Sequence, residues 1–297
     1  MGTTAHLAVD PEHADLLPGA VARLHDLAAR WTRFDPGSEI GRLNAADGRP
    51  VVVAPDTARL LSAAIDAWRR TDGRFDPTVH DALIAAGYDR TFDDGPGPGG
   101  PTTPAPGLAD VAVDTDTGVV VAPADVRFDL GGIGKGHAAD LLVDHLIEQG
   151  ATGTAVTIGG DARVAGDCPF ADGWPIHTAE ADGPIAHLRS GGFCYSTTRK
   201  RRWLVDGEPR HHVIDPSTGR PASGGLVDVA VAAASATIAE VHATAAIVAG
   251  RTDGLRHLAA TGLDGFVVTD TGERVGFGGS DQSPPISRAA ADGTSRE

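Results

Sequence analysis

Apolar residues recur at helical spacing in two segments near the start of the chain. These positions are Val21, Leu24, Leu27 and Ala28 within residues 16–31, and Leu60, Leu61, Ala64, Ile65 and Trp68 within residues 56–70. Gly73 follows the second segment, where a glycine commonly ends a helix. The pattern predicts two amphipathic helices here and a later helix over residues 241–250.

Short apolar runs separated by turn residues predict strands through the rest of the chain. Residues 110–121 have the pattern of a hairpin, because two valine-rich runs flank a turn ending in Gly118. Further strands are predicted over residues 154–158, 162–165, 174–178, 185–188, 193–196, 210–214, 227–233 and 265–268. Successive strands without intervening helices favour an α+β fold of layered sheets and helices over a doubly wound sheet.

Two segments lack any regular pattern. Residues 95–106 are almost all glycine, proline and threonine, which predicts an irregular loop. Residues 280–297 are polar, and we expect them to form a disordered tail. The 297 residues can bury a full core. We therefore expect one domain over residues 1–279, made of two closely packed subdomains.

Charge and composition exclude several classes of function. The formal net charge of −15 argues against a nucleic-acid surface, which needs a basic footprint. The basic run 199–202 is too short to change this, and it fits a solvated, phosphate-facing or acidic-partner strand. No apolar run approaches the ~20 residues of a membrane span. The first residues show no secretion signal, and the two cysteines are expected to be reduced thiols. We therefore expect a cytoplasmic protein.

The segment from Val126 to Asp140 combines a strand end, a glycine-rich loop and the start of a helix expected over residues 137–149. Its loop contains Lys135, and a helix N-terminus behind such a loop suits a phosphate. The loop is not a Walker A motif, because Gly136 follows the lysine where Ser or Thr is required. It is not a Rossmann fingerprint either, because His137 stands where the third glycine is required. A tight turn without a ligand is the alternative.

Four further segments are polar in ways that a core would not require. They are residues 33–44, 73–79, 211–221 and 239–245. In the last of these Glu240 and Thr244 are four residues apart and share a helical face. Taken singly, each segment also fits an ordinary turn, a capping aspartate or a polar helix stripe.

Together with the glycine-rich loop, these segments resemble the ApbE family of FAD:protein FMN transferases. The resemblance runs from the opening Met1-Gly2-Thr3 to about Gly250. The motifs that carry it are Ser-Glu-x-x-Arg-Leu-Asn (38–44), Gly-x-Phe-Asp-Pro-Thr-Val (73–79), Asp-Leu-Gly-Gly-Ile-x-Lys-Gly (129–136) and His-x-Ile-Asp-Pro-x-Thr-Gly (212–219). It implies a T-fold-related α+β fold with FAD held in a cleft between the two subdomains.

The resemblance also implies an activity and a set of site residues. FMN would pass from FAD, the substrate, to a threonine of an acceptor protein with a short Ser/Thr motif, releasing AMP and using Mg²⁺. Positions matching the FAD site are Met1, Phe34, Arg74, Phe75, Asp76, Asp129, Lys135 and Ile214. Positions matching the metal site are Gly132, Glu240, Ala243 and Thr244. Asn44 and His212 match residues needed for turnover.

The residue types suit this chemistry. Oxygen ligands suit Mg²⁺, and a cation neutralises charge on a transferring phosphoryl group. His212 could move the threonine proton, with Asp215 orienting it or acting as the base. The chain departs from the family at Glu240, where aspartate is usual, and at Tyr195–Arg199, which replaces a Thr-Ser-Gly stretch. An FAD-binding protein without transfer, or a hydrolase giving FMN and AMP, are the alternative functions.

Overall fold

A computed structural model describes residues 3–177 and 184–279, and its centre is a seven-stranded antiparallel sheet. The strand order is β1-β5-β6-β9-β14-β15-β16. The strands are β1 (Ala5–Val9), β5 (Gly153–Ile158), β6 (Asp161–Gly166), β9 (Gly191–Thr197), β14 (Leu226–Ala233), β15 (Asp264–Thr269) and β16 (Arg274–Phe277). The N-terminal strand therefore pairs with β5, which follows it by almost half the chain.

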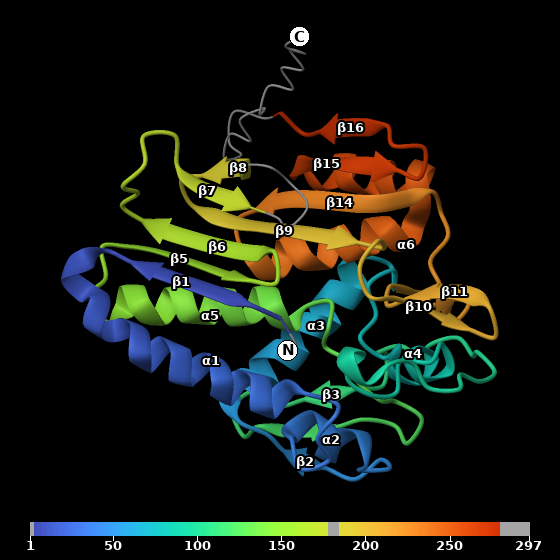
Figure 1. Ribbon diagram of the computed structural model, residues 1–297. Helices are drawn as coiled ribbons and strands as arrows, with labels where there is room; N and C mark the ends of the chain where they lie inside the picture. The colour runs from blue at the N-terminus through green and yellow to red at the C-terminus, as the bar shows by residue number, and fades with distance from the viewer. Residues whose placement is uncertain (1–2, 178–183, 280–297) are drawn as a thin grey trace.

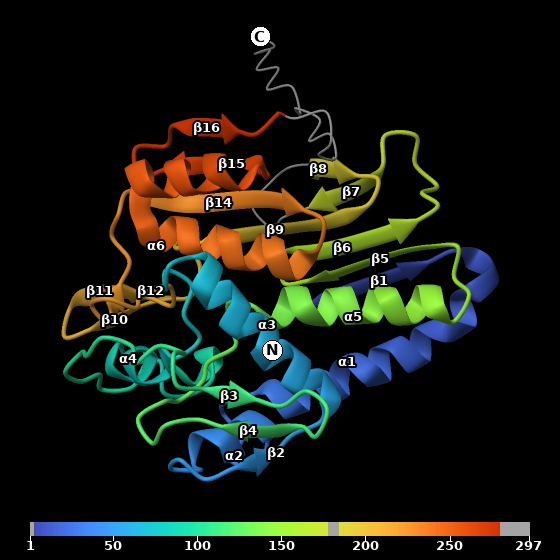
Figure 2. The ribbon, with the colours of Figure 1, turned by 180° about the vertical axis from the view of Figure 1, so that it is seen from behind.

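Both faces of the sheet are covered. Helices α5 (Gly134–Glu148) and α6 (Ala236–Thr261) lie behind it, and the hairpin β7 (Trp174–His177) with β8 (Pro184–Leu188) lies in front (Figures 1 and 2). Strand β14 shows the consequence, since Val229 and Val231 join the core on the helix side while Ala230 and Ala232 join the core under the hairpin. A strand buried on both faces reads as a continuous apolar run, as residues 229–233 do here after Asp228.

The remaining elements pack around the lower part of the sheet (Figure 1). The helices there are η1 (Pro11–Leu16), α1 (Leu17–Trp31), α2 (Glu39–Asn44), α3 (Pro55–Arg70), α4 (His80–Ala85) and η2 (Phe92–Asp94). The strands are β2 (Val51–Val52), β3 (Ala112–Val113), β4 (Val119–Val121), β10 (Arg202–Val205), β11 (Glu208–His211), β12 (Ile214–Asp215) and β13 (Arg220–Pro221). They form one three-stranded sheet, β2-β4-β3, and two hairpins, β10-β11 and β12-β13.

The fold confirms the α+β prediction and most of the predicted elements. The two amphipathic helices are α1 and α3, and the 110–121 hairpin is β3–β4. Gly73 ends α3 with a φ of 74°, and its N–H donates to the Trp68 carbonyl at 2.9 Å. Residues 95–106 have no regular structure. Within the described residues, no helix is long and apolar enough to cross a membrane.

Three predicted boundaries were wrong. The predicted strand 210–214 is two strands, because β11 pairs with β10 and β12 pairs with β13. The late helix is much longer than residues 241–250, because Ser235 caps its start and accepts a hydrogen bond from the Ile238 N–H. The helix after the glycine-rich turn begins at Gly134, not at residue 137.

Helix α6 is interrupted at Gly250, which has a φ of 75° and a ψ of −176°. At the interruption the Arg251 N–H donates to the Gly224 carbonyl at 2.8 Å. A methyl group added at Gly250 would lie 2.7 Å from that carbonyl oxygen, and one added at Gly224 would lie 2.3 Å from the Gly250 Cα. The loop before β14 is therefore in direct backbone contact with α6.

The predicted tail, residues 280–297, and Thr178 at the end of one predicted strand lie outside the described residues. The prediction of one domain with two subdomains stays a prediction.

Candidate functional site

The glycine-rich segment forms a turn that leads directly into α5. The Asp129 N–H donates to the Pro77 carbonyl at 2.7 Å, and the Gly131 N–H donates to Asp129 Oδ1 at 2.7 Å. A methyl group added at Gly136 would lie 2.5 Å from the Ala236 carbonyl oxygen. Gly136 therefore leaves room for the backbone of α6, against which α5 packs.

Lys135 lies in the first turn of α5, not in the loop before the helix, where the sequence analysis placed it. Its ammonium group donates to the Gly131 carbonyl at 2.9 Å, lies 3.0 Å from Asp161 Oδ2, and bonds to Glu240 Oε1. Burial by itself would lower the pKa of Lys135, but the carboxylates of Asp161 and Glu240 outweigh it and raise the pKa. The lysine is therefore charged and held in place.

Glu240 meets Lys135 from α6 across 105 positions of sequence. Its side chain is only 2% exposed, and its second oxygen accepts the Gly136 N–H at 2.8 Å. Burial raises the pKa of Glu240 to about 8, although Lys135 acts in the opposite direction. These contacts bring the glycine-rich turn and the Glu-x-x-x-Thr stretch of α6 together, as the resemblance required.

Asp161 was missed by the sequence analysis. It is the first residue of β6, follows the turn glycines Gly159 and Gly160, and has a side chain that is 4% exposed. A charged residue at the start of a buried strand, directly after two glycines, was the available signal. Cys194 lies beside it with its thiol bonded to the Ala236 carbonyl, and burial raises the pKa of this thiol.

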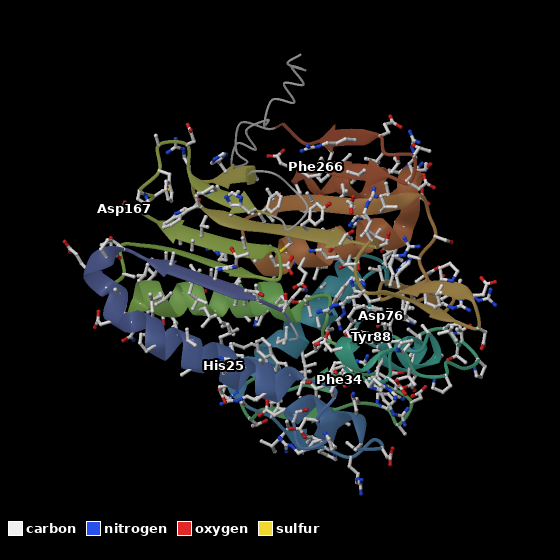
Figure 3. All side chains as sticks on the ribbon, in the orientation of Figure 1. His25, Phe34, Asp76, Tyr88, Asp167 and Phe266 are labelled. Atoms are coloured by element: carbon white, nitrogen blue, oxygen red, sulfur yellow. The ribbon has the colours of Figure 1, made fainter. Side chains whose placement is uncertain are left out.

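The predicted FAD residues Phe34 and Asp129 are joined by Arg33, which was also missed. Arg33 Nε lies 2.6 Å from Asp129 Oδ2, and the guanidinium group lies 4.3 Å from the Phe34 ring centroid and 4.8 Å from that of Tyr88. The Arg33 side chain is only 4% exposed, whereas Phe34 is 39% exposed. The rings of Phe34 and Tyr88 lie 5.8 Å apart, below the main sheet (Figure 3).

Asn44 is fully engaged with the backbone that precedes Asp129. Its Nδ2 donates to the Phe128 carbonyl at 3.0 Å, and its Oδ1 accepts the Phe128 N–H at 2.7 Å. Both ends of the amide are used, so Asn44 can fix the position of the Asp129 segment.

The segment after α3 places its three predicted FAD residues in different surroundings. Phe75 is a core residue whose ring would lie 3.4 Å from a methyl group added at Gly132. Asp76 is buried and accepts hydrogen bonds from Thr78 and from Trp68 Nε1, and burial raises its pKa. Arg74 is partly exposed and pairs with Asp72 at 3.3 Å. Only Arg74 has a side chain that extends toward solvent.

His212 and its neighbours lie where the chain passes from β11 to β12. His212 Nδ1 is buried without a hydrogen-bond partner. Burial, followed by the charge of Arg201, lowers the pKa of His212 to about 3, so the ring is neutral near pH 7. Asp215 Oδ1 accepts from the Ser217 N–H and hydroxyl at 2.9 and 2.7 Å. Ile214 packs in a small core with Trp203.

His211 does not alternate with His212 along one strand, because β11 ends at His211. Its Nε2 lies 3.0 Å from the Ala222 carbonyl, and its Nδ1 accepts the Val213 N–H at 3.3 Å. His211 therefore joins two backbone segments. In the adjoining basic run, Arg199 pairs with Asp228 at 3.0 Å.

A divalent cation would need hydroxyl and backbone oxygens here. Within residues 3–177 and 184–279 no three His, Cys, Asp or Glu side chains form a metal-binding group. A methyl group added at Gly132 would lie 3.6 Å from Thr244 Oγ1, so that glycine, Thr244 and, one helical turn earlier, Glu240 lie in one region. Carboxylate, hydroxyl and carbonyl oxygens fit a hard cation. The Glu240 carboxylate, which would bind the cation, also accepts a hydrogen bond from Lys135.

Two surface concavities lie elsewhere. One, of about 340 Å³, is lined by residues of α5, β6 and the start of α6, including Asp140 and Arg163. The other, of about 450 Å³, lies around α2 and β2. Neither contains a predicted FAD or metal residue. Met1, predicted at the FAD site, lies outside the described residues.

Similar proteins identify the family of this arrangement. The model of the ApbE family matches residues 1–267. A Rhodobacter capsulatus protein named FAD:protein FMN transferase is 29% identical over 90% of this chain and 53% of its own length. A protein of the same name from Klebsiella pneumoniae is 26% identical over 90% of this chain and 81% of its own length. The chain thus spans about half the length of the first of these relatives.

Solved structures agree with this assignment. The ApbE protein of Thermotoga maritima has a TM-score of 0.79 and 26% identity, with 93% of this chain and 94% of that chain covered. The apo flavinyl transferase ApbE of Pseudomonas stutzeri has a TM-score of 0.76 at 22% identity, with the same coverage, and supports the fold. The chain belongs to the ApbE family.

Proposed function

We propose that this chain is an Mg²⁺-dependent FAD:protein FMN transferase. It moves FMN from FAD to a threonine hydroxyl of an acceptor protein that carries a short Ser/Thr motif, and releases AMP. The observation that carries this proposal is the contact of Glu240 with both Lys135 and the Gly136 N–H. This contact joins two motifs that are about a hundred residues apart, so the groups suited to a pyrophosphate and to a cation lie together.

The reaction forms one bond and breaks one. The threonine oxygen attacks the phosphorus of the FMN moiety, the bond from that phosphorus to the bridging oxygen breaks, and AMP leaves with the electron pair. The threonine proton passes to a base. When bound, Mg²⁺ supplies charge neutralisation on the pyrophosphate. Glu240, Thr244 and the carbonyls of Gly132 and Ala243 would hold it.

The other predicted residues divide between binding and positioning. We propose that Met1, Phe34, Arg74 and Asp129 contact FAD. Arg33, which contacts both Asp129 and the Tyr88 carbonyl, would hold Asp129 in position. Three of the predicted FAD residues have side chains buried within the protein, namely Phe75, Asp76 and Ile214. These three residues would therefore contribute to FAD binding through the shape of the site and through their backbone atoms. Lys135 would contribute to FAD binding together with them.

Proton transfer is assigned to His212, with Asp215 as the second candidate. His212 is neutral and has a free Nδ1, so it can accept a proton. Its pKa of about 3 would make it a weak base as it stands, and bound substrate must raise that value for efficient transfer. Asp215 is engaged with Ser217, which favours a role in shaping the turn. Asn44 positions the Asp129 segment.

Glu240 in place of the usual aspartate favours one alternative, FAD binding without transfer. Purified protein incubated with FAD, Mg²⁺ and an acceptor protein bearing the Ser/Thr motif separates the possibilities by intact-mass analysis. A gain of one FMN on the acceptor, absent when its threonine is alanine or when EDTA is added, supports transfer. Free FMN with AMP indicates hydrolysis, and unchanged FAD indicates binding alone; either result contradicts the proposal. A cytoplasmic location stays a prediction.

A further inference from the structure

The ammonium group of Lys135 is shared by two carboxylates, of which only Glu240 belongs to the proposed metal set. Asp161 Oδ2 approaches the same nitrogen to 3.0 Å from the first residue of β6. The Gly131 carbonyl, at 2.9 Å, is a third acceptor. The turn, β6 and α6 therefore each contribute one oxygen, and together they define where the lysine charge lies.

This cluster contains one cation, Lys135, and two carboxyl groups, Asp161 and Glu240. When both carboxyl groups are ionised, the cluster has a net charge of −1 in a buried place. A buried carboxylate is normally kept only where a partner compensates it. If Asp161 acted by charge alone, it would repel the pyrophosphate of FAD, and its removal would strengthen FAD binding. If it acts through Lys135, its removal would weaken FAD binding. The two roles thus predict opposite signs.

The geometry favours the second role. Glu240 already receives the Gly136 N–H as well as Lys135, so its carboxylate is fixed by α5 independently of Asp161. Asp161 lies on the sheet side of Lys135, and its side chain is 4% exposed against 23% for the lysine. Without Asp161, the ammonium group would keep contacts only with the turn and α6 and could turn toward solvent.

We propose that Asp161 is a positioning residue of the transfer site, holding Lys135 where its charge serves the FAD pyrophosphate. The statement about FAD rests on the proposed function. The statement about Lys135 does not, because it concerns a contact within the protein, and the two can be tested separately.

The chain offers an internal standard for the first test. It has two lysines, Lys135 and the exposed Lys200. Brief treatment with acetic anhydride, followed by peptide mass spectrometry, gives the ratio of their labelling rates. In the unchanged protein Lys135 should react far more slowly than Lys200. In Asp161→Asn the labelling rate of Lys135 relative to that of Lys200 should rise about tenfold. This change corresponds to a loss of ~1.4 kcal/mol in the free energy that keeps Lys135 in its contacts.

Asp264→Asn is the matched control, because Asp264 is also a buried aspartate at the first residue of a strand of the same sheet, bonded to the Gly279 N–H. Its ratio should equal that of the unchanged protein. If Asp161→Asn does not fold, Asp161→Ser is measured in its place with the same expectation. An unchanged ratio in the folded Asp161 variant overturns the proposal.

The second test measures the dissociation constant of FAD by flavin fluorescence in a double-mutant cycle. Asp161→Asn should weaken FAD binding about tenfold when Lys135 is present, and should leave it unchanged or tighter in a Lys135→Met background. Tighter binding in the single variant, or equal weakening in both backgrounds, overturns the positioning role. Absence of FAD binding by the unchanged protein would instead refute the proposed function, and the labelling ratio would still decide the role of Asp161.

Discussion

Gly134 and Gly136 both lie in the first turn of α5, yet the structure gives them opposite tolerance to alanine. A methyl group at Gly136 would lie 2.5 Å from the Ala236 carbonyl oxygen and 2.7 Å from its carbon, both backbone atoms. At Gly134 the nearest atom would be Leu130 Cβ at 3.7 Å, an ordinary contact. Neither glycine has a positive φ, so alanine is not strained by its own backbone at either position.

The magnitude follows from two opposing effects. Alanine in place of a helical glycine stabilises by up to ~1 kcal/mol, and this gain is common to both variants. Overpacking at Gly136 costs ~1–3 kcal/mol, because helix α5 or α6 must shift. Gly136→Ala should therefore be ~1–3 kcal/mol less stable than Gly134→Ala, which is itself equal to or more stable than the unchanged protein.

Thermal unfolding followed by circular dichroism measures the difference, at about 2–4 °C per kcal/mol for a domain of this size. Gly136→Ala should also lose FAD affinity, since the shift of α5 or α6 that relieves the overlap would move the Gly136 N–H away from Glu240. Equal melting temperatures for the two variants would refute the close approach of α5 and α6. Loss of FAD affinity in both, with stability unchanged, would indicate that both glycines face the ligand.

Substitutions at three further residues are expected to have measurable effects. Glu240→Gln should raise the Mg²⁺ concentration needed for half-maximal turnover, because glutamine offers no charged oxygen ligand. Glu240→Asp keeps a carboxylate and should retain activity. A Mg²⁺ titration that is the same for both variants and the unchanged protein would contradict the assignment of Glu240 as a metal ligand. Asn44→Ala should lower the free energy of unfolding in urea by ~1–3 kcal/mol, because the Phe128 N–H and carbonyl both lose their partner; full stability with lost turnover would indicate direct catalysis instead. His212→Gln should reduce turnover ~10²–10⁴-fold with FAD binding kept. The same variant should flatten the loss of stability as pH falls from about 6.5 toward 3, because the native ring stays neutral while the unfolded ring gains a proton; an unchanged pH profile would show that His212 is not buried in solution.

Much of the fold could be predicted because its signals are local. The apolar faces of α1 and α3 are each formed by residues of the helix itself, and Gly73 ends α3 directly after it. The valine runs of β3 and β4 likewise surround their own turn. Boundaries set by distant partners were not predictable. The strand 210–214 divides at His212 because its halves pair with different strands, which no alternation pattern within the segment reveals.

The site shows the same division. Lys135 and Glu240 were identified by motif, but their contact depends on the packing of α5 against α6, which Gly136 permits. The sequence placed Lys135 in the glycine-rich loop, but its position in the structure depends on Asp161 and Glu240, which are distant in sequence. Arg33 and Asp161 carried no motif and are recognised only from the atoms that they meet, Asp129 and Lys135.

The interruption of α6 at Gly250 has a mechanical consequence for the site. A continuous helix can slide along its axis or rotate as a rod while keeping its hydrogen bonds. The close backbone contact between Gly250 and Gly224, with the hydrogen bond from the Arg251 N–H to the Gly224 carbonyl, opposes both movements. Glu240 lies about 15 Å along the axis from this point. We therefore expect a side chain introduced at Gly224 or Gly250 to shift α6 and, through it, the position of Glu240, although neither glycine lies in the site.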